Sequence, residues 1–235
     1  MKITIVSDLH GQAPVLKGGD LLIIAGDMTA RDRLDEWALF FDWLKKQDYR
    51  KKILIAGNHD NFFMSGFPKS QEEAEDLQEV QSFLIEQGEM EKPDFEYLCD
   101  SGCEFEGFKI WGSPWNLSFR GMNEDCMAFT VHTEAQLAEQ WAKIPTDTDI
   151  LITHSPPFGI FDKTYTRSRV GSKTLLNEVQ MRLNSIKLHC FGHIHEGYGM
   201  SKLKKVDSDD LYWVVNASHM NQHYEPINLP IEIEL

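Results

Sequence analysis

Short, nearly continuous apolar runs rich in β-branched residues recur along the chain. Runs of about four to eight residues without a polar face are typical of strands that are covered on both sides. The sequence therefore predicts buried strands at residues 2–7, 21–25, 52–56, 150–153, 188–191 and 212–215. A hairpin is also predicted over residues 105–110, because Glu106 and Gly107 form a turn signal between apolar neighbours.

Apolar residues at helical spacing separate several of these strands. The helices are predicted by three sets of residues: Trp37, Phe40, Phe41 and Leu44; Leu137, Trp141 and Ile144; Leu175, Leu176, Val179 and Leu183. Strands that alternate with helices indicate a layered α/β fold. The 235 residues contain no repeat and no linker-like tract, so a single domain over residues 1–235 is predicted.

The composition is that of a globular protein, with 42% hydrophobic and 26% charged residues and a net charge of −14 at pH 7. This acidic balance disfavours stable binding to nucleic acids or to anionic membranes. The four cysteines include no CxxC pair, and the sequence has neither a signal-peptide core nor a run near about 18 apolar residues. We expect a cytoplasmic protein with free thiols and no membrane segment.

Five of the predicted strands end directly before potential metal ligands. In chain order these are Asp8 and His10, Asp27 after Gly26, Asn58 and His59 after Gly57, His154, and His193 and His195 after Gly192. The carboxyl ends of strands in an open α/β sheet line one edge, where ligands bind. The topology therefore predicts that these segments converge on one site.

The residue types and their spacing indicate metal binding. Residues at i and i+2 of an extended segment point to the same side, so Asp8 and His10 share a face, as do His193 and His195. The glycines before three of the segments allow sharp turns and close approach of a ligand. Imidazole, carboxylate and amide donors suit Mn, Fe, Zn, Ni or Mg. The set exceeds one tetrahedral site, which favours two ions with a bridging carboxylate.

The ordered motifs Asp-x-His, Gly-Asp, Gly-Asn-His-Asp, His and Gly-His-x-His span residues 8–195 and resemble the calcineurin-like metallophosphoesterase superfamily. The resemblance implies a four-layer α/β/β/α sandwich of two mixed sheets, with a dinuclear centre at the sheet edges. It assigns one divalent ion to Asp8, His10, Asp27 and His195, and the second to Asp27 as bridge, Asn58, His154 and His193. We favour manganese for both positions.

The same resemblance assigns catalytic and substrate-binding roles. His59 matches the position that acts as general acid or contacts the substrate phosphate, and Asn58 is expected to contact the substrate as well. Asp27 is expected to be catalytic as the bridging ligand. Asp60 is expected to cap the following helix rather than to orient His59.

A finer resemblance covers residues 153–157, 169–171 and 191–199, which are similar to the MPPED (239FB) subgroup of metallophosphodiesterases. This resemblance implies weak hydrolysis of cyclic nucleotides and model phosphodiesters. Some vertebrate members carry glycine at the position of His193, which weakens their second metal position. This chain has His193 and the complete ligand set, which implies full two-metal activity. The protein-phosphatase motif Gly-Asp-x-x-Asp-Arg-Gly is not matched at Ala30 and Asp32, which argues against a protein Ser/Thr phosphatase.

Residues 162–173 form a basic segment in an acidic chain. The segment follows His154 closely enough to border the site, so Arg167 and Arg169 are candidate contacts for a substrate phosphate. A solvated loop with ordinary surface charges is an equally good interpretation.

Several other features receive structural interpretations. Residues 70–87 are acidic and predict a solvated helix or lid, and closure of residues 64–88 over the site is left open. Residues 202–210 are polar enough to form an exposed loop. Phe62 and Phe63 are expected to belong to the core rather than to stack on a base, and His189 is expected to be packed rather than metal-ligating.

These features predict a metal-dependent phosphoric ester hydrolase with a small-molecule substrate. The favoured function is a phosphodiesterase that hydrolyses a small diester, such as a cyclic nucleotide, through a hydroxide bridging two ions. The alternatives are a phosphomonoesterase, a dinucleoside polyphosphate hydrolase and, in another class, a non-catalytic metal-binding scaffold. The sequence predicts neither the substrate nor the oligomeric state.

Overall fold

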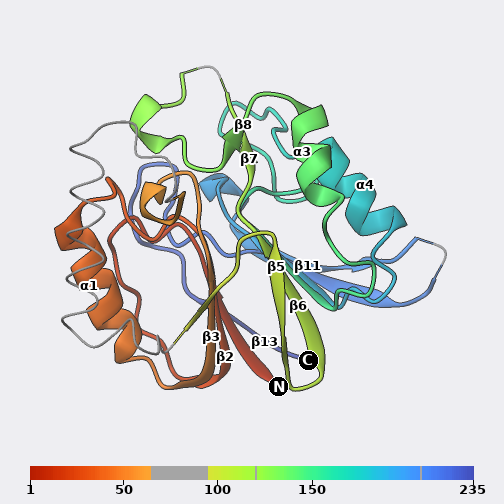
Figure 1. Cartoon of the computed structure of the whole chain (residues 1–235), viewed down its shortest axis with the longest axis horizontal. Coiled ribbons are helices and arrows are strands. Elements are labelled where there is room, and N and C mark those ends of the chain that lie inside the picture. Colours follow the sequence, from red (N-terminus) through yellow and green to blue (C-terminus); the bar gives the residue numbers. More distant parts are fainter. Residues whose placement is uncertain (65–94, 120, 207) are drawn as a thin grey trace.

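The computed structural model describes residues 1–64, 95–119, 121–206 and 208–235, and two β-sheets form its centre (Figure 1). The first sheet has the strand order β13 (Ile231–Glu234), β1 (Lys2–Val6), β2 (Gly19–Ala25), β3 (Tyr49–Ile55) and β4 (Glu96–Tyr97). The second has the order β11 (Gly199–Lys204), β12 (Leu211–Asn216), β10 (Leu188–Phe191), β9 (Ile150–Thr153), β6 (Phe108–Ser113) and β5 (Ser101–Phe105). Both sheets are mixed, because each contains parallel and antiparallel pairs.

The remaining elements are helices and one short strand pair. The helices are α1 (Leu34–Lys45), α3 (Glu134–Trp141) and α4 (Lys173–Met181), and the 3₁₀ turns are Asn61–Met64, Glu124–Cys126 and His195–Gly197. Strands β7 (Asn116–Leu117) and β8 (Thr130–Val131) pair in parallel. Capping residues start two of the helices: Thr133 accepts the Gln136 N–H before α3, and Ser172 accepts the Leu175 N–H before α4.

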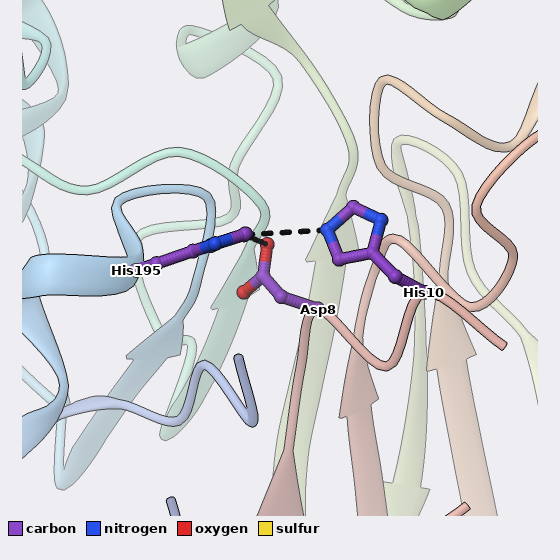
Figure 2. A group of neighbouring side chains, drawn as sticks. All are labelled: Asp8, His10 and His195. Atoms are coloured by element: carbon purple, nitrogen blue, oxygen red, sulfur yellow. Dashed lines mark hydrogen bonds and ion pairs between the residues drawn. The ribbon is translucent and has the colours of Figure 1, made fainter. Parts of the chain in front are cut away.

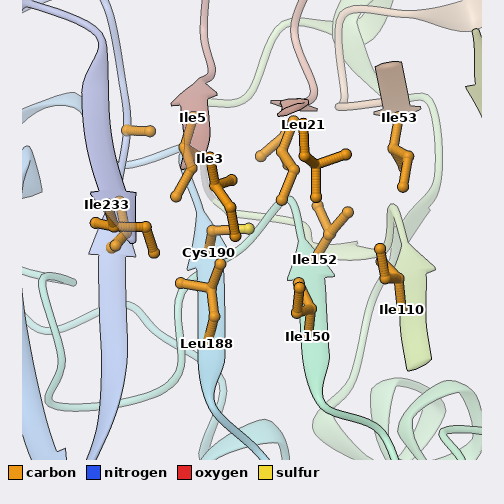
Figure 3. Close-up of a cluster of buried hydrophobic side chains, with 14 of the residues drawn as sticks. Ile3, Ile5, Leu21, Ile53, Ile110, Ile150, Ile152, Leu188, Cys190 and Ile233 are labelled. Atoms are coloured by element: carbon orange, nitrogen blue, oxygen red, sulfur yellow. The ribbon is translucent and has the colours of Figure 1, made fainter. Parts of the chain in front are cut away.

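Apolar side chains fill the space between the two sheets (Figure 3). Ile3 and Ile53 extend from the first sheet, and Ile110 and Ile150 from the second. The helices cover the outer faces: α1 packs on the first sheet, and α3 and α4 pack on the second. The four-layer α/β/β/α sandwich is therefore confirmed.

The parallel strands in the middle of each sheet bring distant segments to one edge. Strands β1, β2 and β3 run parallel, as do β9, β10 and β12. A bridge between Ser7 and Ser218 joins the ends of the two sheets, with Ser7 N–H donating to Ala217 O and His219 N–H donating to Ser7 O. The carboxyl ends of β1 and β12 thus lie side by side.

The predicted elements agree with the structure at most positions. All six predicted strands, the 105–110 hairpin and the three predicted helices are present, with shifts of up to four residues at the element ends. Lys202 lies in β11 rather than in an exposed loop, because it pairs with Trp213 of β12. The predictions for residues 70–87 and for all of 64–88 except Met64 fall outside the described residues. Within the described ranges, no helix is long and apolar enough to cross a bilayer.

His189 on β10 is buried and predicts acid sensitivity. Its Nε2 lies 2.9 Å from Thr153 Oγ1, and burial lowers the pKa of His189 to about 3. The unfolded chain binds a proton at this site below pH about 6.5, whereas the folded protein does not, so the stability falls as the pH falls from about 6.5 toward 3. We expect His189→Gln to reduce the stability lost between pH 7 and pH 5 by about 2 kcal/mol.

The measurement is urea unfolding of both proteins at the two pH values. Exposed His132 offers the matched control, since His132→Gln removes an imidazole that burial does not affect. Equal acid sensitivity of His189→Gln and the parent protein would contradict the prediction.

Candidate metal centre

Four of the seven predicted metal ligands share an unusual backbone conformation. The φ angles of Asp8, His10, Asp27 and His193 are 51°, 42°, 55° and 67°, in the left-handed region that residues other than glycine rarely adopt. Each such residue costs about 1–3 kcal/mol and persists only where the surrounding structure enforces it. Backbone strain of this kind clusters at ligand sites, which agrees with the prediction of a site at these strand ends.

Gly57 and Gly192 allow the ligand side chains to approach the backbone. A Cβ atom at Gly57 would lie 2.1 Å from Asp27 Oδ1 and 2.6 Å from His154 Cε1. A Cβ atom at Gly192 would lie 2.1 Å from Asp8 Oδ2. The prediction that glycines make room at the strand ends is confirmed.

Asp8, His10 and His195 form one end of the cluster (Figure 2). His195 Nε2 lies 3.5 Å from Asp8 Oδ1 and 3.2 Å from His10 Nε2. The buried Asp8 carboxylate accepts the His193 backbone N–H at 3.0 Å and the Ser218 hydroxyl at 2.7 Å. Groups that follow β10 and β12 of the second sheet therefore fix the side chain of Asp8, which follows β1 of the first sheet.

Asp27 lies between this end and the other. Its Oδ1 accepts the His59 backbone N–H at 2.9 Å, while its Oδ2 lies 3.4 Å from His154 Nε2 and 3.8 Å from His10 Nε2. His154 Nε2 also lies 3.1 Å from Asn58 Oδ1. The Asp27 carboxylate therefore touches side chains from both ends, as a shared ligand must.

Three of the imidazoles are held in one orientation by backbone carbonyls. The contacts are His59 Nδ1 to Ala30 O at 2.8 Å, His154 Nδ1 to Ala25 O at 2.9 Å, and His195 Nδ1 to Asn221 O at 3.1 Å. A carbonyl oxygen only accepts, so Nδ1 donates and Nε2 is left for another partner. This arrangement is typical of metal-ligating histidines, whose second ring nitrogen donates to a carbonyl or carboxylate.

The electrostatics of the cluster favour cation binding. Burial opposes ionisation of Asp8 and Asp27, but nearby imidazoles outweigh it and hold both carboxyl pKa values below their usual range. Burial lowers the pKa of His10 to about 4 and that of His193 to about 3. Burial also acts to lower the pKa of His154, but the Asp27 charge outweighs burial and raises the pKa of His154 to about 9. Ionised carboxylates and neutral imidazoles are the forms that bind metals, so Asp8, Asp27, His10 and His193 are in their binding form at pH 7, whereas a metal ion would have to displace a proton from His154.

The donor set fits a divalent metal centre. Ligand atoms lie within 4.8 Å of one another in three overlapping groups: Asp8, His10 and His195; His10, Asp27 and His59; Asp8, Asp27 and His154. Burial of a carboxylate costs free energy unless a cation pairs with it. Oxygen and imidazole donors together suit Mn, Fe, Zn, Ni or Mg. His193 belongs to none of these groups, although its ring centroid lies 5.0 Å from that of His154.

Comparison with known proteins agrees with this geometry. The profile described as calcineurin-like phosphoesterase matches residues 1–197. The chain belongs to the calcineurin-like phosphoesterase family. Membership of this family supports a metal-dependent phosphoester hydrolase.

Two curated proteins and one solved structure resemble the chain over nearly its whole length. Metallophosphoesterase domain-containing protein 1 from Homo sapiens is 39% identical, over 98% of this chain and 69% of that protein. UPF0046 protein T07D4.2 from Caenorhabditis elegans is 32% identical, over 94% of this chain and 55% of that protein. The crystal structure of TT1561 from Thermus thermophilus has a TM-score of 0.54 at 15% identity, covering 92% of this chain and 88% of that one, which supports the fold alone.

In this phosphoesterase, the end of β12 supplies groups that the sequence analysis missed. Asn216 Oδ1 accepts the backbone N–H of Ser218, and the single hydroxyl proton of Ser218 is shared between Asn216 Oδ1 at 2.8 Å and Asp8 Oδ2 at 2.7 Å. Asn216 Nδ2 donates to Ile194 O at 2.9 Å, which fixes the loop between His193 and His195. The motif Asn216-Ala-Ser218 directly follows the predicted strand at residues 212–215. Its polar residues could therefore have been found in the same way as the predicted ligands, which also follow predicted strands.

Two predicted substrate contacts, Arg167 and Arg169, have other surroundings. Arg169 Nη1 forms an ion pair with Asp162 Oδ1 at 2.9 Å, and Arg167 lies on an exposed turn with a φ angle of 65°. No hydrogen bond or ion pair joins either arginine to a predicted metal ligand within the described ranges. Phe62 and Phe63 pack in the layer beneath α1, where the ring centroids of Phe62 and Trp37 lie 5.0 Å apart, so their core assignment is confirmed.

Asp60 joins two ligand loops instead of capping a helix. Its carboxylate accepts backbone N–H groups from Met28 at 3.0 Å, Thr29 at 3.3 Å and Gly57 at 2.8 Å. The predicted cap is therefore wrong, because the oxygens turn back toward the loops after β2 and β3. Those loops carry Asp27 and Asn58.

Asp60→Asn is expected to loosen both loops. The amide replaces one accepting oxygen with a donor that faces backbone N–H groups, which costs about 1–3 kcal/mol of unfolding free energy. Misplacement of Asp27 should lower Mn²⁺ affinity about 10- to 100-fold, as for other outer-shell changes. Urea unfolding and calorimetric Mn²⁺ titration measure the two effects. Asp32→Asn is the matched control, and equal Mn²⁺ affinity of both variants would contradict the prediction.

Proposed function

We propose that the chain is a dinuclear metal-dependent phosphodiesterase acting on a small diester such as a cyclic nucleotide, with the whole chain as one catalytic domain. The observation that carries the proposal is the convergence of anchored imidazoles on the Asp8 and Asp27 carboxylates. One ion would be held by Asp8, His10, Asp27 and His195, and the other by Asp27, Asn58, His154 and His193. When bound, divalent ions such as Mn²⁺ polarise phosphoryl oxygens and activate water.

His59 is the proposed general acid. Its Nδ1 donates to Ala30 O, and its ring lies edge-on to His10 with centroids 4.6 Å apart. These contacts leave Nε2 for the oxygen of the leaving group. With His59 in the imidazolium form, Nε2–H would give its proton to that oxygen as the phosphorus–oxygen bond breaks, which leaves the neutral imidazole still donating from Nδ1 to Ala30 O. Asp27 positions His59 by accepting its backbone N–H.

Asn58 is the proposed substrate contact beside the second ion. Its Nδ2 donates to Cys126 O at 3.1 Å, so its Oδ1 is directed toward His154. This orientation presents an oxygen donor where a metal ion and a phosphoryl group would meet. Arg167 and Arg169 remain candidate substrate contacts.

The charge distribution favours a diester over a monoester. A monoester brings nearly two negative charges to a protein with a net charge of −14, and a diester brings one. Arg169 is already paired with Asp162, so it is poorly placed to balance the second charge. A phosphomonoesterase or a dinucleoside polyphosphate hydrolase is the second candidate, because the same ligands would serve it.

The test is hydrolysis of bis(p-nitrophenyl) phosphate and p-nitrophenyl phosphate by Mn²⁺-loaded protein. We expect faster diester cleavage, and a fall in kcat of about 10²- to 10⁴-fold for His59→Ala at unchanged Mn²⁺ content. His132→Ala, at an exposed imidazole, is the control. Faster monoester cleavage would favour the second candidate, and Mn²⁺ binding without any hydrolysis would favour a non-catalytic scaffold.

A further inference from the structure

Tyr224 is an exposed aromatic residue against two of the proposed ligands. Its ring centroid lies 5.0 Å from those of both His10 and His195, with interplanar angles of 67° and 78°. The side chain nevertheless remains 59% exposed. Tyr224 also lies beyond residues 1–197, the part that the family profile matches. The ring therefore reaches the site from a segment outside the matched part of the chain.

The backbone around Tyr224 is constrained to hold the ring in place. Tyr224 has a φ angle of 58°, a conformation that costs free energy for a bulky side chain. Asn221 stabilises it: its carbonyl accepts the Tyr224 N–H at 3.0 Å, and its Oδ1 accepts the N–H groups of His223 and Glu225 at 2.8 and 3.0 Å. The same carbonyl accepts His195 Nδ1. One residue thus links the strained turn directly to a metal ligand.

Phe119 is the other described aromatic residue that is both exposed and close to a ligand. It is 57% exposed, and its ring centroid lies 6.4 Å from that of His193. This contact is longer than either contact of Tyr224 and involves a single imidazole. The φ angle of Phe119 is not in the left-handed region. Tyr224 is therefore the better candidate for a residue positioned by its loop toward the site.

We propose that Tyr224 is a specificity-determining residue, whose ring stacks with a planar aromatic substituent of the phosphoester bound at the metal centre. The proposal rests on the proposed function, because it places the phosphorus at the Asp8 and Asp27 cluster. An exposed ring within 5.0 Å of two ligands lies where the first atoms of an ester substituent must leave the site. Aromatic stacking is tolerant of the exact ring, so aryl and nucleobase substituents would both be favoured over alkyl ones.

The test compares phenylphosphonate with methylphosphonate, two non-hydrolysable anions with the same head group. Calorimetric titration of the Mn²⁺-loaded protein should give at least about fivefold tighter binding of phenylphosphonate. Tyr224→Leu should reduce this preference to about one, and Tyr224→Phe should keep it, because the ring rather than the hydroxyl makes the contact. Ile227→Ala, an exposed apolar truncation in the same segment, should leave it unchanged.

Four outcomes would overturn the proposal. The first two are an equal affinity of the parent protein for both anions and a loss of the preference for phenylphosphonate in Tyr224→Phe. The other two are a loss of that preference in Phe119→Leu but not in Tyr224→Leu, and a loss of Mn²⁺ from Tyr224→Leu. The last result would make Tyr224 a support for His10 and His195 only. Binding is measured directly, so an absence of hydrolysis would refute the proposed function without affecting this comparison.

Discussion

Asp27→Asn is expected to abolish hydrolysis and to remove most of the Mn²⁺ affinity. The amide retains an oxygen that can accept the His59 N–H, but it loses the charge that lies 3.4 Å from His154 and 3.8 Å from His10. Asp27 belongs to two of the three ligand groups, so one substitution weakens both ends of the cluster. We expect losses in Mn²⁺ affinity and in kcat/KM beyond the roughly 100-fold typical of outer-shell changes.

The measurements are bound Mn²⁺ after gel filtration and diester hydrolysis. Asp32→Asn provides the same chemical change five residues away, at a carboxylate that accepts the Trp37 Nε1–H and the Phe62 N–H and takes part in no ligand group. This control should keep both properties. Retention of stoichiometric Mn²⁺ and of more than a tenth of the activity by Asp27→Asn would exclude Asp27 as the shared ligand.

The sequence predicted that these side chains converge, because the fold has parallel central strands. Continuous apolar runs identify strands covered on both faces, and parallel strands end at a common edge. Residues directly after β1, β2, β3, β9 and β10 therefore had to meet once two such sheets packed together. The glycine positions followed from the same reasoning, since a ligand next to a strand end needs space.

Contacts made by loops escaped the sequence analysis. The roles of Asn216, Ser218 and Tyr224 depend on how the chain turns after β12, and no periodicity specifies that path. Asp60 was assigned to a helix cap, which is the usual local role of its residue type, whereas its carboxylate accepts from Met28 and Thr29, in a loop about 30 residues away in sequence, and from Gly57. Strand β13 was missed because its alternating Ile231 and Ile233 are few and close to the chain end.

Gly192→Ala is expected to displace Asp8 and so to remove the metal site by a purely steric route. The new Cβ would lie 2.0 Å from Ser7 Oγ and 2.1 Å from Asp8 Oδ2, distances that require these groups to move. Neither group is free to move, because Ser7 Oγ donates to Ala25 O and Asp8 accepts from Ser218. Overpacking of this kind costs about 3 kcal/mol of unfolding free energy, and Mn²⁺ affinity should fall at least about 100-fold.

The matched control for Gly192→Ala is Gly19→Ala. Gly19 begins β2, at the end of the first sheet opposite to Asp8. Its Cβ would meet nothing closer than Tyr49 Cε1 at 3.3 Å, so stability should change by less than about 1 kcal/mol and Mn²⁺ affinity should not change. Urea unfolding and Mn²⁺ titration distinguish the two glycines. If Gly192→Ala binds Mn²⁺ as tightly as Gly19→Ala, then the Asp8 position is not required for the metal centre, and the ligand assignment at that end is wrong. A loss of Mn²⁺ affinity in Gly192→Ala alone would instead show that the metal site requires a glycine at this strand end.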